Sequence, residues 1–256
     1  MITKHPGTKD IPALRSLWKQ AFEDTEETMD NFFSIAYAPE RCLCAWEDGR
    51  IVAMVYWFDH RWREHKVAYA YAVATDTAYQ KRGICRKLLE SLAKRLRKQG
   101  YYGIFLVPAE PELVALYEKL GYVVAATMCH YDVPAAGTPD PELRQITWEK
   151  YAFYRAQLLP EESLLPGEEV YRFLDTYQGF YRCSCGIFCG AVEESENGRL
   201  LRMQEFLGEP KGMFTAIRAM DCYGAKVRLY GGAAFGMFRS LTRKKEMPKY
   251  MGLPMD

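Results

Sequence analysis

The sequence predicts a mixed α/β fold of the α+β kind, divided into two domains. Helical and strand patterns alternate over residues 10–133 in the order α-α-β-β-β-α-β-α-β. Residues 134–141 hold three prolines and one glycine, which is typical of a linker, and the alternation begins again after them. A chain of 256 residues is long enough for two small domains. We therefore expect domains at residues 1–135 and 136–256.

The first domain opens with two helical patterns, residues 11–24 and 25–38, in which apolar residues recur at spacings of three and four. Apolar strand patterns follow at residues 42–46 and 51–58. They flank the turn signal Glu47-Asp48-Gly49-Arg50, which predicts a β-hairpin.

A strand–helix–strand unit comes next, with strands at residues 67–75 and 104–107 and a helix at residues 84–99. A crossover of this kind places its two strands parallel and side by side. In the first strand we expect Tyr69, Tyr71 and Val73 on one face and small alanines on the other. A helix at residues 111–120 and a strand at residues 123–131 complete the domain.

The second domain repeats part of this order, with a strand at residues 200–207, a helix at 212–223 and a strand at 227–230. Between the first strand and the helix lies Gly208-Glu209-Pro210-Lys211-Gly212. It carries an acidic side chain and a proline, which has no amide hydrogen. This loop is poorly suited to hold a phosphate, so we expect one cofactor site in the chain.

The composition excludes several classes of function. Lys and Arg number 34 against 33 for Asp and Glu, so no excess charge favours nucleic acid or an anionic membrane. The basic residues Arg239, Arg243, Lys244 and Lys245 are interpreted as a solvated face. The first residues form no apolar run, and no window approaches about 18 apolar residues. We therefore expect a cytoplasmic protein without a spanning helix.

Eight cysteines without a secretory signal predict reduced thiols. Cys183, Cys185 and Cys189 form a C-x-C-x3-C cluster, so a metal site has to be considered. Zinc sites pair such a cluster with a second pair or with histidines, but only Cys222 remains in that half and no histidine follows His130. We expect packed thiols and no metal.

The strongest functional signal is Tyr79-Gln80-Lys81-Arg82-Gly83-Ile84-Cys85-Arg86, between a strand and a helix. The first amides of a helix have no internal partner and its dipole makes that end positive, so a diphosphate can bind there. Lys81, Arg82 and Arg86 can balance the remaining charge, and Gly83 lets the backbone come close. Taken alone, one glycine also fits a solvated basic helix start.

A second motif, Leu116-Tyr117-Glu118-Lys119-Leu120-Gly121-Tyr122, closes the next helix. With the two motifs in this order, residues 10–133 resemble the GNAT superfamily of N-acetyltransferases. The acyl-CoA loop of that family, Q/R-x-x-G-x-G/A, is matched by Gln80, Gly83 and, imperfectly, Cys85. Its later pattern Y-x-K-x-G-F/Y is matched by Tyr117, Lys119, Gly121 and Tyr122.

The resemblance implies the GNAT fold, with a centrally splayed sheet, and an N-acetyltransferase that uses acetyl-CoA as cosubstrate. Tyr117 would donate a proton to the leaving thiolate, and a phenol of pKa about 10 stays protonated for that step. The backbone of the splayed strand would meet the pantetheine arm. The implied cofactor-binding residues are Val73, Ala74, Thr75, Gln80, Lys81, Arg82, Gly83, Ile84, Cys85 and Arg86.

Two residues depart from the family pattern. Cys85 replaces a second Gly or Ala, and a thiol is small enough to fit there. Glu110 stands about seven residues before the tyrosine, where the family often has Asn, which puts one hydrogen bond to pantetheine in doubt.

The general base is not fixed by the sequence, and water can also carry the proton away. His60 and His65 flank a hairpin tip that we expect beside the acceptor site. The candidate side chains in or beside the sheet are Glu47, Asp59, His60, His65 and Asp76.

The layout also resembles the enhanced intracellular survival aminoglycoside acetyltransferases, which join an active domain to a degenerate second GNAT-like domain. Their loop reads R-R-G-[IV]-x-R, and their terminal carboxylate serves as base, which would be Asp256 here. We expect residues 136–256 to shape the site of a small-molecule or peptide amine. No metal, nucleic acid or membrane partner is expected, and a homo-oligomer stays open. The alternative function is a sensor that binds acyl-CoA without turnover.

Overall fold

The computed structural model describes residues 1–255, and the chain divides into two compact units. Unit 1 comprises Met1–Val124 and Gly236–Met247, and unit 2 comprises Ala125–Phe235 and Pro248–Met255. Residues 236–247 thus pack with the first unit although they lie beyond the linker. The division at residue 135 into a catalytic and an acceptor-shaping domain stays a prediction.

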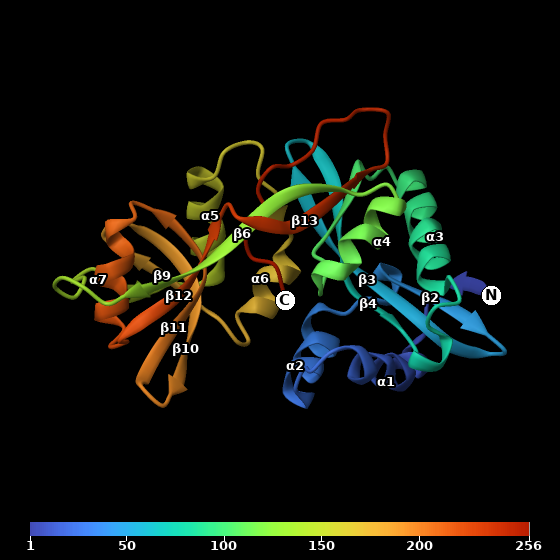
Figure 1. Cartoon of the computed structure of the whole chain (residues 1–256), viewed down its shortest axis with the longest axis horizontal. Coiled ribbons are helices and arrows are strands. Elements are labelled where there is room, and N and C mark those ends of the chain that lie inside the picture. The colour runs from blue at the N-terminus through green and yellow to red at the C-terminus, as the bar shows by residue number, and fades with distance from the viewer. Residues whose placement is uncertain (256) are drawn as a thin grey trace. The chain divides into compact units, whose positions relative to one another are not determined.

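In unit 1 the chain forms a mixed sheet in the strand order β1-β2-β3-β4-β5-β13 (Figure 1). β4 and β5 are parallel, with Ala70 opposite Leu106, which confirms the predicted crossover, and the neighbours from β1 to β4 are antiparallel. The patterns predicted neither β1 nor β13. The strands are β1 (Ile2–Lys4), β2 (Cys42–Glu47), β3 (Arg50–Trp62), β4 (His65–Thr75), β5 (Gly103–Leu106) and β13 (Ala233–Ser240).

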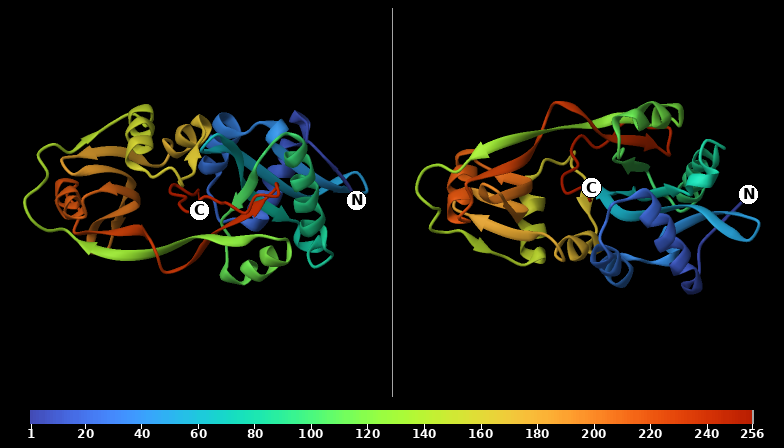
Figure 2. Two further views of the ribbon diagram at one scale, coloured as in Figure 1. Left: turned by 90° about the horizontal axis from the view of Figure 1, so that it is seen from above. Right: turned by 60° about the horizontal axis from the view of Figure 1, so that its bottom comes forward.

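Helices cover both faces of this sheet. Figure 2 shows the chain from two further sides. One face carries small and aliphatic side chains such as Ala68 and Ala70, which pack against Leu88 and Leu92 of α3 (Ile84–Lys98). α4 (Val114–Lys119) packs in the same core through Tyr117. The other face carries the aromatic rings and is covered by α1 (Ile11–Ala21) and α2 (Glu26–Asn31).

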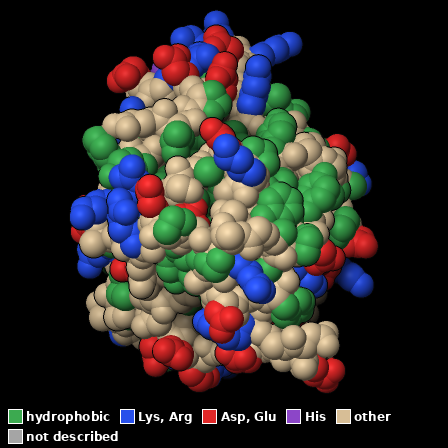
Figure 3. Space-filling model, turned by 90° about the vertical axis from the view of Figure 1, so that its left-hand side faces the viewer, with side chains coloured by type: hydrophobic (Ala, Val, Ile, Leu, Met, Phe, Trp, Pro, Cys, Tyr) green, Lys and Arg blue, Asp and Glu red, His purple; other side chains and the backbone are tan. Residues whose placement is uncertain are grey.

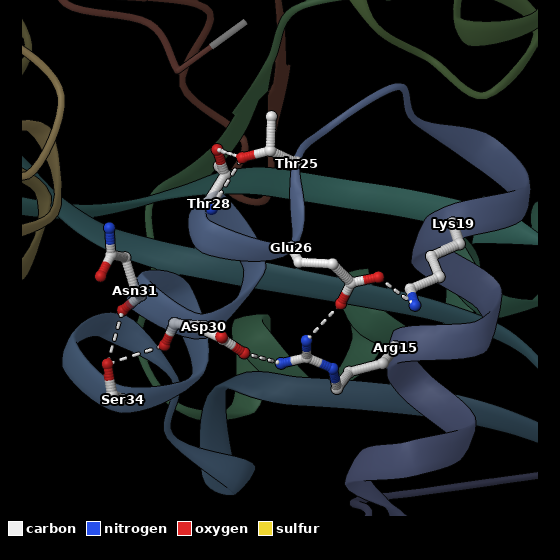
Figure 4. A network of polar contacts seen from close by, with 8 residues as sticks. All are labelled: Arg15, Lys19, Thr25, Glu26, Thr28, Asp30, Asn31 and Ser34. Atoms are coloured by element: carbon white, nitrogen blue, oxygen red, sulfur yellow. Dashed lines mark hydrogen bonds and ion pairs between the residues drawn. The ribbon is translucent and has the colours of Figure 1, made fainter.

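α1 and α2 are joined by a polar network (Figure 4). Arg15 of α1 donates to Glu26 at 2.8 Å and to Asp30 at 2.7 Å, and Lys19 also pairs with Glu26. Thr25 caps α2 by accepting from the Thr28 amide at 3.1 Å. These contacts are exposed, so they contribute modestly to stability.

In unit 2 the strands follow the order β6-β12-β11-β10-β9-β7. β11 and β12 are parallel, with Leu200 opposite Gly224, and α7 connects them, so the predicted second strand–helix–strand unit is confirmed. The elements are β6 (Val123–Pro134), β7 (Arg144–Gln145), α5 (Trp148–Leu158), β8 (Leu165–Pro166), α6 (Glu168–Leu174), β9 (Gly179–Cys183), β10 (Gly186–Ser195), β11 (Gly198–Gly208), α7 (Lys211–Ala219) and β12 (Gly224–Tyr230).

The core of unit 2 contains a fully buried ion pair. Arg155 of α5 donates to both carboxylate oxygens of Glu205 in β11, at 2.7 and 3.0 Å. The hydroxyls of Tyr151 and Tyr250 donate to the same carboxylate, each at 2.8 Å. Because Tyr250 lies in the segment Pro248–Met255, the ion pair fixes this segment to unit 2.

Within residues 1–255, no helix is both long and apolar enough to cross a membrane. Asp256, whose carboxylate is a candidate base by resemblance, lies outside the described residues.

Candidate functional site

β4 loses one of its two neighbours halfway along its length. It pairs with β5 from Val67 to Ala70, and its pairing with β3 continues to Thr75. Among the described residues, no strand pairs with the β5 side of β4 beyond Ala70. Backbone donors and acceptors on that side therefore have no strand partner. This is the predicted splay, and it contains Val73, Ala74 and Thr75.

A β-bulge in β4 lies at the start of the splay. Met54 pairs with Ala74 and Tyr56 with Tyr71, which leaves Val55 opposite two residues, Ala72 and Val73. Ala72 has φ 49°, a left-handed conformation that costs a residue with a side chain about 1–2 kcal/mol. Strain of this kind often marks a functional segment, and a bulge re-aims the residues after it.

The bulge corrects one detail of the predicted strand. Tyr69 and Tyr71 lie on the aromatic face as expected, but Val73 packs with the core on the alanine face. The extra residue shifts the alternation by one, so every side chain after it changes face.

The start of α3 offers free backbone donors beside this strand. The first hydrogen bond of the helix runs from the Lys87 amide to the Gly83 carbonyl at 3.1 Å. The preceding amides, those of Ile84, Cys85 and Arg86, have no acceptor within residues 1–255. Gly83 caps the helix with φ 73°, where a glycine is favoured, and the first turn holds no acidic residue. The geometry is that of an anion-binding helix start.

The basic side chains of the loop differ in whether they form ion pairs. Arg82 pairs with Glu47 at 2.8 Å, and Arg86 pairs with Glu90 at 3.2 Å. Lys81 has φ 60° and no ion pair within the described part of the chain. Gln80 donates to the Thr75 carbonyl at 3.4 Å, which joins the loop to the end of β4. The pairing of Arg82 was not foreseen, because no sequence signal links residues 35 apart.

Tyr117 lies against the loop rather than in solvent. Its side chain is 5% exposed, and it belongs to the core cluster that also contacts Val73 and Cys85. Burial, and to a lesser degree the neighbouring Cys85, raises the pKa of Tyr117 above its ordinary value of about 10. The ring of Tyr122 packs edge-on against it, with centroids 5.6 Å apart. Tyr117, Val73 and Cys85 thus pack in one core, and Cys85 lies close enough to Tyr117 to affect its pKa.

The five candidate bases fall into two groups. Glu47 and Asp76 lie at the loop end of the sheet, where Asp76 accepts from the Ala78 amide at 2.9 Å. Asp59, His60 and His65 lie toward the β3–β4 hairpin.

In the hairpin group, Asp59 accepts from the Tyr101 hydroxyl, His60 is buried against Tyr69, and His65 stacks on Tyr102 at 4.5 Å. Tyr71, the first residue beyond the pairing with β5, lies six positions after His65, which is about 20 Å of extended chain.

The start of α7 in unit 2 differs from that of α3. The amides of Gly212 and Met213 donate to the carbonyls of Glu209 and Pro210, at 2.9 and 3.1 Å. Lys211 forms an ion pair with Glu209 at 2.7 Å. These donors are already engaged, so α7 offers no cradle like that of α3.

All eight cysteines lie among the described residues and are free thiols. Cys183 and Cys189 are buried in unit 2, while Cys185 is partly exposed. Within residues 1–255, no group of three or more His, Cys, Asp or Glu side chains is arranged to hold a metal ion.

The surface drawn in Figure 3 carries Lys and Arg side chains interspersed with Asp and Glu. Exposed hydrophobic side chains lie between them.

Comparison with known proteins identifies related folds. Residues 3–125 match the family model for the acetyltransferase (GNAT) domain. No curated protein matches the chain. A GCN5-related N-acetyltransferase from Anabaena variabilis is 14% identical, with a TM-score of 0.73 over 94% of this chain and 73% of that one.

Two further solved structures resemble the chain over both units. Eis1 from Mycobacterium abscessus is 10% identical, with a TM-score of 0.68 over 94% of this chain and 73% of that one. A protein from Pyrococcus horikoshii is 16% identical, with a TM-score of 0.62 over 98% and 93%. At these identities the likeness concerns the fold alone. The family assignment comes from the first unit: residues 3–125 form an acetyltransferase domain of the GNAT family.

Proposed function

We propose that this protein transfers an acetyl group from acetyl-CoA to a primary amine, with Tyr117 as the general acid. The observation that carries the proposal is the juxtaposition of three features. These are the splayed end of β4, the free amides at the start of α3 and the buried phenol of Tyr117 beside Cys85.

The proposed cosubstrate fits each feature by its chemistry. The diphosphate of acetyl-CoA would accept from the amides of Ile84, Cys85 and Arg86, with Lys81 adding positive charge. The Ile84 side chain is buried in the core, so only its backbone can take part. The amides of the pantetheine arm would pair with β4 beyond Ala70, as an added strand would.

The proposed reaction is direct attack of a neutral amine on the thioester carbonyl. The new C–N bond forms, the C–S bond breaks, and the amine proton leaves to water or a base. The thiolate of coenzyme A takes the Tyr117 proton, and the phenol is restored from solvent. Because the pKa of Tyr117 is raised by burial, the phenol carries its proton throughout the neutral range.

The test is a thiol-release screen with acetyl-CoA against a panel of small-molecule and peptide amines. Tyr117→Phe is expected to lower thiol release about 100-fold while coenzyme A binding changes little. Tyr122→Phe is the matched control, since it removes a buried hydroxyl from the neighbouring ring. Equal losses in both variants would contradict a specific role for Tyr117. Silence of the parent protein across the panel, with coenzyme A still bound, would favour the sensor.

A further inference from the structure

The ion pair between Glu47 and Arg82 engages the cofactor loop in the free protein. Nη2 of Arg82 donates to Oε2 of Glu47 at 2.8 Å, and the guanidinium lies 4.8 Å from the ring centroid of Tyr79. The Arg82 side chain is 51% exposed and that of Glu47 is 20% exposed. Arg82 therefore has an anionic partner before any phosphate arrives, and it is exposed enough to turn away.

The backbone at Glu47 is fixed by its hairpin. Glu47 pairs with Arg50 across a two-residue turn, in which Asp48 and Gly49 have φ of 49° and 78°. Turns with positive φ at both central residues match the twist of the flanking strands, so they are favoured in two-residue hairpins. An exchange of partners would thus be made by the side chains of Glu47 and Arg82 alone.

A cavity of about 350 Å³ opens beside Glu47 and is also lined by Trp46, Asp48 and Gly49. Water in this cavity can solvate the Glu47 carboxylate once Arg82 turns away. Breaking the ion pair therefore does not leave an unsolvated charge. In the first turn of α3 there is no acidic residue. Glu47, in contrast, is a carboxylate that contacts the basic loop from outside the helix.

We propose that Glu47 competes with the diphosphate of acetyl-CoA for Arg82 and thereby sets the affinity of the loop for the cosubstrate. This inference rests on the proposed function, since it requires coenzyme A at the start of α3. When the diphosphate binds, Arg82 exchanges its carboxylate partner for phosphate oxygens, a strong charge-assisted contact. Glu47 is then a positioning residue, and the amine proton leaves by another route.

The expected effect is modest because exposed ion pairs are weak. Glu47→Gln is expected to lower the Kd of coenzyme A about two- to fivefold, and Arg82→Gln to raise it by a similar factor. In the Arg82→Gln background, Glu47→Gln should give no further gain. Asp48→Asn is the matched control, because it removes the same charge from the next residue, which has no contact with Arg82 in the described chain.

The experiment is isothermal titration calorimetry with coenzyme A at fixed ionic strength, on the full chain and these variants, with circular dichroism to show that each is folded. The inference is overturned if Glu47→Gln binds no more tightly than Asp48→Asn. It is also overturned if the gain persists without Arg82. Failure of the unaltered protein to bind coenzyme A would instead overturn the proposed function.

Discussion

Replacing Arg155 by Met should destabilise unit 2 strongly, because it leaves a buried carboxylate without its cation. Both side chains of the Arg155–Glu205 pair are 0% exposed. The substitution removes two hydrogen bonds to Glu205 and a longer one to the Leu164 carbonyl at 3.4 Å. Only two neutral hydroxyl donors would remain on the carboxylate.

Breaking one side of a buried pair costs about 3–5 kcal/mol. The two tyrosine hydroxyls still solvate Glu205, so we expect the lower end, about 3 kcal/mol. A chain of two units need not unfold in one step, so the measurement has to be local. Amide hydrogen exchange followed by mass spectrometry reports on α5 and β11 separately. At about 1.4 kcal/mol for each tenfold change, protected amides there should exchange roughly 150-fold faster.

Arg172→Met is the matched control in the same unit. Arg172 is 52% exposed and lies 3.9 Å from Glu168 in a helical i,i+4 pair, so its loss should cost less than about 0.5 kcal/mol. Adding Glu205→Gln to Arg155→Met should restore part of the loss, because it removes the unpaired charge. Equal exchange rates in the Arg155→Met and Arg172→Met variants would refute the reasoning.

Three further predictions concern the loop and one buried carboxylate. Gly83→Ala forces a side chain into φ 73°, so it should lower the unfolding free energy by about 1 kcal/mol and weaken coenzyme A binding, measured by thermal melting and calorimetry. Burial raises the pKa of the Cys85 thiol to about 11, so at pH 8 about one thiol in 1,000 is ionised. Iodoacetamide should therefore label it slowly, with a rate that climbs up to about pH 11; fast labelling at pH 8 would contradict this. Burial alone would raise the pKa of Asp140, but hydrogen bonds from Ser184 and the Glu142 amide lower it overall. The stability that the ionised Asp140 contributes is present above its unfolded pKa and is lost as pH falls through its folded pKa. The cost of Asp140→Asn, about 1–2 kcal/mol, should therefore shrink as the pH falls below about 4 in acid denaturation.

The sequence predicted the elements whose signals are local. The crossover from β4 to β5, the hairpin at Glu47–Arg50 and the start of α3 each follow from patterns within a few residues. β1 is only three residues long, which is too short for a periodic pattern. β13 pairs with β5 from a distant part of the chain, and single-sequence patterns carry no information on such partners.

For the candidate site, the sequence motifs predicted the loop and Tyr117 but neither the bulge nor the ion pair. The loop and Tyr117 were found from their motifs, and the structure brings them into one core. The bulge at Ala72 could not be found, because alanine gives no signal for positive φ and the strain is imposed by the surrounding sheet. The Glu47–Arg82 pair depends on two elements meeting at one end of the sheet, which only the fold determines.

The two strand–helix–strand units of the chain have the same topology, but the starts of their helices differ in chemistry. In each unit a crossover helix connects two parallel strands, so each crossover helix begins after the carboxyl end of the first of these strands. At α3 the amides are open and the cap is a glycine, whereas at α7 Pro210 occupies the cap and the amides of Gly212 and Met213 are already bonded. Gly212 also has no room for a side chain, since a Cβ there would lie 2.6 Å from Cys185. An anion site needs unengaged donors and space in front of them, so the shared topology permits such a site and the loop residues decide whether it forms.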